Sequence, residues 1–176
     1  MLNNLNVKES TLKGVYIIKP LSIFEDYRGE YIQLYSKKEH ETLLPTDTNF
    51  VEDDISITYK NCFKGIHGDD RTYKLISCIY GIFYLVIVNN DENSDQYRKH
   101  TSFTLSDKNK LQILVPPKFG NGHLAISDMS IFHYKQTSYY EPSRQFTIRW
   151  NDPNYNIRLP IKNPIVSERD EVGHIV

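Results

Sequence analysis

The chain consists mainly of short strand-like segments, and this feature constrains its fold most. The stretch "YKLISCIYGIFYLVIVNN" (residues 73–90) has the pattern of two apolar strands separated at Gly81. Other segments rich in Ile, Val, Tyr, Phe and Thr are separated by turns such as "EDYRG", "DKNK", "KFGNG" and "EPS". About ten short strands with such punctuation predict an all-β antiparallel sandwich or barrel.

Helical signals are scarce. The best candidate is the short segment "KKEHETLL" (residues 37–44), which ends before Pro45. Strands do not alternate with helices and no glycine-rich phosphate fingerprint is present, so a dinucleotide-binding α/β fold is not expected. A chain of 176 residues is most simply one domain spanning 1–176. The irregular segment after "WNDP" is expected to pack across the body of that domain.

Composition narrows the function classes. The formal net charge is −1 with both signs mixed along the chain, which argues against a nucleic-acid-binding protein. The sequence has no run of signal-peptide or membrane-spanning type, and we predict a cytoplasmic protein. Cys62 and Cys78 match no metal-ligand spacing and are expected to be buried, reduced thiols. His40, His100 and His174 are expected at the surface.

His67 is the histidine whose surroundings need an explanation. It follows an apolar strand and precedes Asp69, Asp70, Arg71 and Lys74. A cupin-type metal site requires a His-x-His pair, and the second position here is Asp69, so no metal is predicted. Local features alone leave two interpretations open, a residue of a polar surface loop or an active-site base.

Two tyrosines supply the second chemical signal. Tyr134 and Tyr140 lie six residues apart, so a continuous strand would place both on one face. Such a pair is usually part of a core or of a rim. A tyrosine that faces a histidine across a cavity is also a competent general acid.

The order of motifs resembles the nucleotide-sugar 3,5-epimerases, cupin-fold enzymes whose best-known member acts on dTDP-4-keto-6-deoxyglucose. The similarity runs from about residue 15 to 170. Its pieces are, in order, "FEDYRGEYIQLY", "KGIHGDDRTYKLISCIYG", "VPPKFGNGHLAISD", "YKQTSYYEPSRQFTIRWNDP" and "VSERD". The resemblance implies a cupin jelly-roll barrel with a few short helices, a homodimer, and an isomerase that needs neither metal nor other cofactor.

The resemblance also implies a role for each matching residue. His67 matches the catalytic base, Asp170 the carboxylate that pairs with it, and Tyr134 the general acid on the opposite face of the sugar. Lys74 matches the cation beside the C4 oxygen, where enolate charge develops. Inversion at C3, and possibly at C5, would follow from proton removal on one face and return on the other.

Several positions depart from the family pattern. Lys64 replaces an arginine, Asn121 a histidine and His123 an aromatic residue, while Glu52 and Asp54 replace amides. A carboxylate can accept two hydrogen bonds from guanine, whereas thymine offers one donor. The resemblance, with these departures, predicts GDP rather than dTDP, and a GDP-4-keto-heptose of capsular polysaccharide synthesis as substrate. The predicted substrate-binding set is completed by Arg28, Ser56, Tyr140 and Arg169.

Three alternatives remain at this point. The chain could act on a dTDP-4-keto-6-deoxyhexose, as the best-known member of the family does. It could also be a nucleotide-sugar 3,4-ketoisomerase, or a sugar-binding cupin without activity. The sequence leaves open whether C5 is epimerised, and whether each active site contains residues of both subunits.

Overall fold

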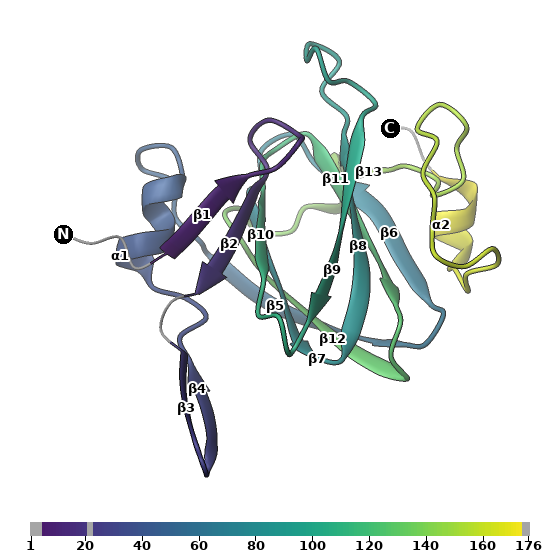
Figure 1. Cartoon of the computed structure of the whole chain (residues 1–176). Helices are drawn as coiled ribbons and strands as arrows, with labels where there is room; N and C mark the ends of the chain where they lie inside the picture. Colours follow the sequence, from purple (N-terminus) through teal and green to yellow (C-terminus); the bar gives the residue numbers. More distant parts are fainter. Residues whose placement is uncertain (1–4, 21–22, 174–176) are drawn as a thin grey trace.

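The computed structural model describes residues 5–20 and 23–173 (Figure 1). Short helices are confined to two segments outside the sheets and to one turn. They are α1 (Lys37–His40), η1 (Glu41–Leu43), η2 (Pro142–Arg144) and α2 (Glu168–Val172). The strands are β1 (Leu5–Glu9), β2 (Tyr16–Pro20), β3 (Ile23–Asp26), β4 (Gly29–Ile32), β5 (Glu52–Tyr59), β6 (Phe63–Gly68), β7 (Lys74–Tyr80), β8 (Ile82–Asn89), β9 (His100–Ser106), β10 (Gln112–Val115), β11 (Phe119–Ala125), β12 (Met129–Gln136) and β13 (Phe146–Thr147).

The strands form two antiparallel sheets and a separate hairpin. The six-stranded sheet has the order β1-β2-β10-β7-β12-β5, and the five-stranded sheet has the order β13-β6-β11-β8-β9. Strands β3 and β4 pair only with each other, and Figure 1 shows this hairpin projecting from the body. The predicted all-β cupin jelly roll with a few short helices is confirmed.

The main core lies between the two sheets. Alternate residues of β8, namely Phe83, Leu85 and Ile87, are fully buried there against residues of the opposite sheet such as Ile76 and Ile113. Successive side chains of a strand point to opposite faces, so this accounts for every second apolar residue of β8.

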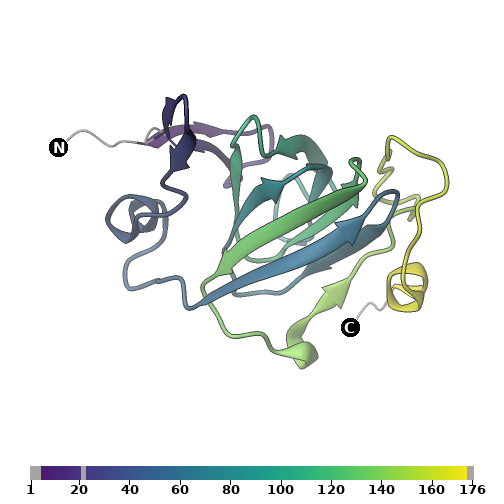
Figure 2. The same ribbon diagram turned by 90° about the horizontal axis from the view of Figure 1, so that it is seen from below.

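The remaining apolar residues of β8 face outward and are buried by the C-terminal segment. Val86 and Val88 pack there with Ile148, Tyr155 and Ile157. The six-stranded sheet is covered in the same way by the segment around α1, which buries a cluster of Ile18, Leu44, Leu75 and Leu114. Figures 1 and 2 place α1 and α2 on opposite sides of the molecule. The tail therefore packs across the body, as expected from its sequence.

Two predicted boundaries were wrong. The "KFGNG" stretch was expected to be a turn, but Phe119–Ala125 forms strand β11. A side chain at Gly120 would meet Ile66 and Phe146, and one at Gly122 would meet Phe63. These glycines therefore permit close packing within a sheet. The continuous strand expected to hold Tyr134 and Tyr140 ends at Gln136 instead, so Tyr140 lies in the following loop.

Two predictions of exposure also require correction. His40 was expected at the surface but is 2% exposed, and its Nε2 lies 3.1 Å from Oε1 of Gln112. Cys62 was expected to be buried and is only half-buried, whereas Cys78 is buried and both are free thiols. His100 is half-buried on β9, and His174 lies outside the described residues. No helix in the described part of the chain is long and apolar enough to cross a membrane.

Candidate active site

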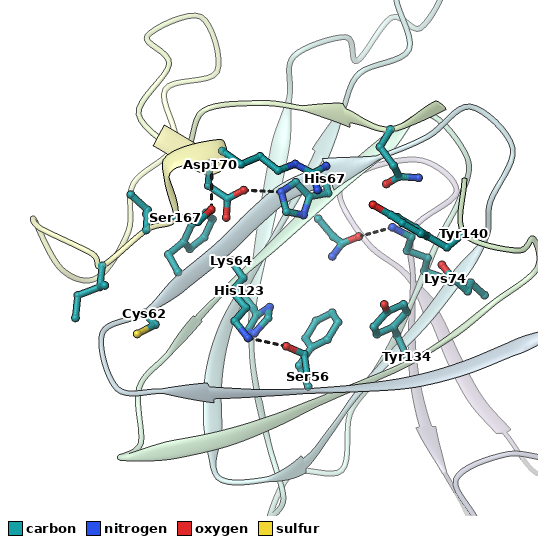
Figure 3. A pocket seen from close by; sticks show the side chains of 18 residues that line it. Ser56, Cys62, Lys64, His67, Lys74, His123, Tyr134, Tyr140, Ser167 and Asp170 are labelled. Carbon is teal, nitrogen blue, oxygen red and sulfur yellow. Dashed lines mark hydrogen bonds and ion pairs between the residues drawn. The ribbon is translucent and has the colours of Figure 1, made fainter. Parts of the chain in front are cut away.

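A cavity of about 520 Å³ opens between the two sheets (Figure 3). Strands of both sheets and the segment before α2 contribute its lining. Ten of the thirteen predicted site residues lie in this lining: Ser56, Lys64, His67, Lys74, Asn121, His123, Tyr134, Tyr140, Arg169 and Asp170. The structure thus brings most of the predicted site into one pocket, although its members are spread over more than a hundred positions of the chain.

His67 is held by a carboxylate from the C-terminal segment. It lies on β6, and its Nε2 is 2.6 Å from Oδ1 of Asp170 on α2. The other oxygen of Asp170 accepts a hydrogen bond from the backbone N–H of Gly65, at 3.1 Å. The Ser167 hydroxyl caps α2 by accepting from the N–H of Asp170. The carboxylate is thereby fixed in position, and it orients the imidazole in turn.

Asp170 is 3% exposed, so its charge requires compensation. Burial by itself would raise its pKa, but hydrogen bonds from His67, Gly65 and Ser167, with the positive charge of His67, hold that pKa below its usual value. Asp170 is therefore ionised near neutral pH and accepts the Nε2–H of His67. In the neutral form of the imidazole, this leaves Nδ1 of His67 with its lone pair available to a ligand.

Tyr134 reaches the pocket from the opposite sheet. It lies on β12, where it is paired in register with Asp54 of β5. Burial raises the pKa of the Tyr134 hydroxyl, and the negative charges of Asp54 and Glu52 raise it further. The hydroxyl is consequently protonated near neutral pH and is able to donate a proton. Figure 3 shows His67 and Tyr134 on opposite sides of the cavity.

Lys74 lies at the start of β7, beside Tyr134 and Tyr140 in Figure 3. Its ammonium group donates one long hydrogen bond, 3.4 Å, to Oδ1 of Asn121. Burial lowers the pKa of Lys74, and the charge of Asp69 opposes this effect. A cation with this single hydrogen bond among the described residues is well placed to interact with an anionic oxygen of a ligand.

Other predicted binding residues form hydrogen bonds with protein groups around the cavity. The Lys64 ammonium donates to the Ser56 hydroxyl and to the carbonyl oxygen of Ile57, both at 2.9 Å. The guanidinium of Arg169 donates to the Thr147 hydroxyl at 3.2 and 3.3 Å. The Tyr140 side chain is exposed at the rim, and its backbone N–H donates to Glu52.

Three predicted residues do not line the pocket. Arg28 lies in the projecting β3–β4 hairpin, where its guanidinium pairs with Asp26 at 2.6 Å. Glu52 and Asp54 lie on β5, and both accept hydrogen bonds from the Gln136 amide, at 2.5 and 3.4 Å. Their oxygens are therefore partly occupied by the protein.

Several residues that line the pocket are not among the predicted site residues. Gln136 is two positions beyond Tyr134 on β12, and strand alternation could have identified it. Gln145 follows the turn η2, and its amide donates to Asp69 at 3.0 Å. Ile165, Val166 and Ser167 belong to the irregular tail, and no periodic signal marks them.

The arrangement suits proton transfer at a carbon. A base with an ordered carboxylate partner lies on one wall, a protonated tyrosine lies on the other, and a lysine lies beside them. These are the groups needed to remove a proton next to a carbonyl, stabilise the enolate and return a proton on the opposite face.

Comparisons with known proteins agree with this chemistry. Residues 9–175 match the family model described as dTDP-4-dehydrorhamnose 3,5-epimerase. A relative of that name from Escherichia coli K12 is 33% identical over 171 residues, covering 95% of this chain and 92% of its own.

Solved structures give the same result. An epimerase from Legionella pneumophila in complex with dTDP-4-keto-L-rhamnose has a TM-score of 0.90 and 30% identity, over 96% of this chain and 91% of its own. A dTDP-4-dehydrorhamnose 3,5-epimerase from Bacillus anthracis with TDP and pyrophosphate bound also has a TM-score of 0.90 and 30% identity, over 98% and 99%. The chain belongs to the dTDP-4-dehydrorhamnose 3,5-epimerase family, whose members are isomerases that act on nucleotide sugars.

Proposed function

We propose that the protein epimerises C3, and possibly C5 as well, of a nucleoside-diphosphate 4-keto sugar. One observation carries the proposal: the His67–Asp170 pair and Tyr134 reach the same cavity from opposite sheets. A non-catalytic sugar-binding cupin would have no need of an ordered base and a facing acid. A 3,4-ketoisomerase would need the base, but a tyrosine on the opposite face is better explained by inversion.

The proposed reaction proceeds through an enolate. The 4-keto group makes the hydrogens on C3 and C5 acidic. Nδ1 of His67 takes the C3 proton, and the electron pair of the C–H bond moves into the C3–C4 bond as the carbonyl becomes an enolate. Asp170 stabilises the resulting imidazolium. The Tyr134 hydroxyl then gives its proton to C3 from the other face as the enolate returns to the ketone. The imidazolium releases its proton to solvent and the tyrosinate takes one up, which restores both groups.

Lys74 has the electrostatic role in this scheme. Charge develops on the C4 oxygen when the C3 proton leaves, and an ammonium group within a partly desolvated pocket stabilises that charge more than water would. The long contact with Asn121 leaves the other N–H groups of Lys74 free for this oxygen.

We propose a dTDP-4-keto-6-deoxyhexose as the first substrate. Support comes from the names of the relatives and from the dTDP-sugar and TDP bound in two similar structures. The GDP preference predicted from Glu52 and Asp54 loses support, because these carboxylates do not line the cavity and instead accept hydrogen bonds from Gln136. The family resemblance implied by the sequence is confirmed, but its GDP-heptose branch is not supported by the comparisons.

A GDP-4-keto-heptose remains the second candidate. The observation in its favour is the pair Asn121 and His123, polar residues that line the sugar pocket where the family pattern has a histidine and an aromatic residue. A sugar with an additional hydroxyl group would use such polarity.

Proton exchange in heavy water tests the function and the substrate together. We expect the C3 signal of a dTDP-4-keto-6-deoxyhexose to disappear from the proton NMR spectrum as deuterium enters, with formation of the C3-inverted sugar. GDP-4-keto-heptose is measured in parallel. Faster exchange of the heptose would reverse the substrate order, and movement of the carbonyl would indicate a ketoisomerase. Absence of exchange in both sugars would favour the remaining interpretation, a sugar-binding cupin without activity.

We further propose that residues 1–176 act as one unit in the cytoplasm and as a homodimer. The β3–β4 hairpin projects from the body and exposes Phe24, Tyr27 and Tyr31, so a second subunit is a reasonable neighbour for it. In such a dimer Arg28 would reach the partner's pocket, which explains its distance from the pocket of its own chain.

Subunit mixing tests this arrangement. Arg28→Ala and His67→Asn homodimers are each expected to be almost inactive. Co-refolded mixtures should regain about a quarter of the wild-type sites, because half of the dimers are mixed and each has one intact site. Arg144→Ala, which alters an arginine that pairs with Asp70 in its own chain, is the control. It should be active by itself, and an equal mixture with His67→Asn should show only the half of the sites that carry His67. Absence of recovery in confirmed mixed dimers would contradict a shared site.

A further inference from the structure

His123 is a polar residue built into the wall of the sugar pocket. It lies on β11 and is only 4% exposed, although its ring lines the cavity (Figure 3). Its neighbour Gly122 points the other way, toward Phe63 and Ile66. The strand therefore presents the imidazole to the cavity and its glycine to the hydrophobic cluster behind the sheet.

The ring is fixed by two separate contacts. It stacks on Phe132 with a centroid distance of 4.3 Å and an interplanar angle of 11°. Its Nε2 lies 2.9 Å from the hydroxyl of Thr58, a residue that is 1% exposed and does not line the cavity. Stacking fixes the plane of the ring, and the hydrogen bond fixes its rotation within that plane.

Nδ1 is left as the polar atom available to a ligand. Among the described residues, the structure records no hydrogen bond from Nδ1 of His123. The buried side-chain polar atoms that are sealed and unpaired in that part of the chain are Ser130 Oγ and His133 Nδ1. Nδ1 of His123 is not one of them, so it retains contact with the cavity.

The imidazole is uncharged over the working pH range. Burial lowers its pKa to about 3, and the positive charges of Lys64 and His67 act in the same direction. A neutral imidazole with Nε2 engaged has two possible tautomers, in which Nδ1 is either a donor or an acceptor. A hydroxyl group satisfies both, because it donates and accepts.

The register of the sheet indicates which end of the substrate lies nearby. His123 is paired with Lys64 across β11 and β6, and paired residues place their side chains on the same face. Lys64 is a cation of the pocket wall. Under the proposed function, a diphosphate beside its ammonium would put the anomeric carbon near His123. The neighbouring hydroxyl groups of the sugar are then the one on C2 and any on the substituent of C5.

We infer that His123 is a specificity residue, whose Nδ1 hydrogen-bonds a sugar hydroxyl next to the anomeric end of the substrate. This inference rests on the proposed epimerase function. A sugar that lacks the hydroxyl would cover Nδ1 without pairing it, and sites built in this way reject the deoxy analogue.

The test compares matched sugars on one nucleotide. The set contains a 4-keto sugar, its 2-deoxy analogue, and a pair that differs in having CH2OH or CH3 on C5. Both dTDP and GDP series are measured by C3 exchange. For the wild type we expect one of the two hydroxyl-bearing sugars to exceed its deoxy partner about tenfold or more in kcat/KM. His123→Phe should bring that ratio to about one, and the pair that responds identifies the hydroxyl.

Thr58→Val provides a second, milder variant. It removes the hydrogen bond that fixes the ring but keeps the imidazole, so the same ratio should fall in part. It also serves if His123→Phe does not fold, which thermal unfolding would reveal. The inference would be overturned if a folded variant kept the wild-type ratio of kcat/KM between the hydroxyl-bearing sugar and its deoxy partner. A wild type inactive on every sugar would instead refute the proposed function, and the inference with it.

Discussion

The His67→Asn variant is expected to lose C3 proton exchange by roughly 10²- to 10⁴-fold, the contribution of a positioned general base. Asparagine is close in size and can still donate to Asp170, but its amide has no basic lone pair to accept a carbon-bound proton. Proton NMR in heavy water, with the sugar that the wild type turns over, measures the effect directly. Binding of the nucleotide should be much less affected, because the imidazole contacts the sugar.

The chain offers a matched control for this substitution. His133 also pairs with an aspartate, since its Nε2 lies 2.6 Å from Oδ1 of Asp53. However, it lies on the other face of β12 and does not line the cavity. His133→Asn should therefore exchange the C3 proton at the wild-type rate. The comparison separates loss of a base in the pocket from loss of a His–Asp pair as such.

Asp170→Asn should give an intermediate result. The base is still present, but the imidazolium loses its anionic partner, and the asparagine amide can favour the wrong tautomer of His67. We expect slow but measurable exchange of the C3 proton.

If His67→Asn exchanges the C3 proton as fast as the wild type, His67 is not the base and the His67–Asp170 pair is only structural.

The apolar stretch at residues 74–89 is an example of what the sequence predicts well. The central glycine and the unbroken run of large apolar residues indicated two strands, and β7 and β8 end and begin on either side of Gly81. The pattern is continuous because both sheets are covered on their outer faces as well, by the tail and by the α1 segment. Local pattern was sufficient because burial on both faces leaves few polar positions, of which Ser77 lies inside the run.

The local sequence pattern was misleading at positions whose structure depends on residues far away in the sequence. Gly120 and Gly122 indicated a turn, but they are required by side chains of Phe63, Ile66 and Phe146 that approach the strand closely. His40 indicated a surface helix, but its burial depends on Gln112, 72 positions away. Neither contact is encoded in the neighbouring residues.

In the candidate site, too, local sequence was not sufficient where the partner residue lies far away in the chain. Local features left His67 open between a surface loop and an active site, because its partner Asp170 is 103 positions away. Resemblance to a family, rather than spacing, placed the two together. It also implied a role for Arg28, which the structure does not bring to the pocket of its own chain.

The Tyr134→Phe variant is expected to separate exchange from inversion. Phenylalanine keeps the ring that packs at 5.4 Å from Phe132 but has no proton to give. His67 can still remove the C3 proton, and the imidazolium proton can exchange with deuterated water before it returns to the same face. The sugar should therefore become labelled at C3 while the inverted product forms about 10²-fold more slowly or worse.

This outcome depends on Tyr134 being a donor in the native enzyme. Burial and the charges of Asp54 and Glu52 keep its pKa above the ordinary tyrosine value, so the hydroxyl carries its proton throughout the neutral range. Tyr140→Phe is the comparison, since Tyr140 lines the same pocket from an exposed loop position and should affect binding while inversion continues. If Tyr134→Phe forms inverted sugar at the wild-type rate, the proton comes from another group and Tyr134 is only part of the wall. If it loses labelling together with inversion, removal and return of the proton are not separable steps, and the tyrosine is needed before the enolate forms.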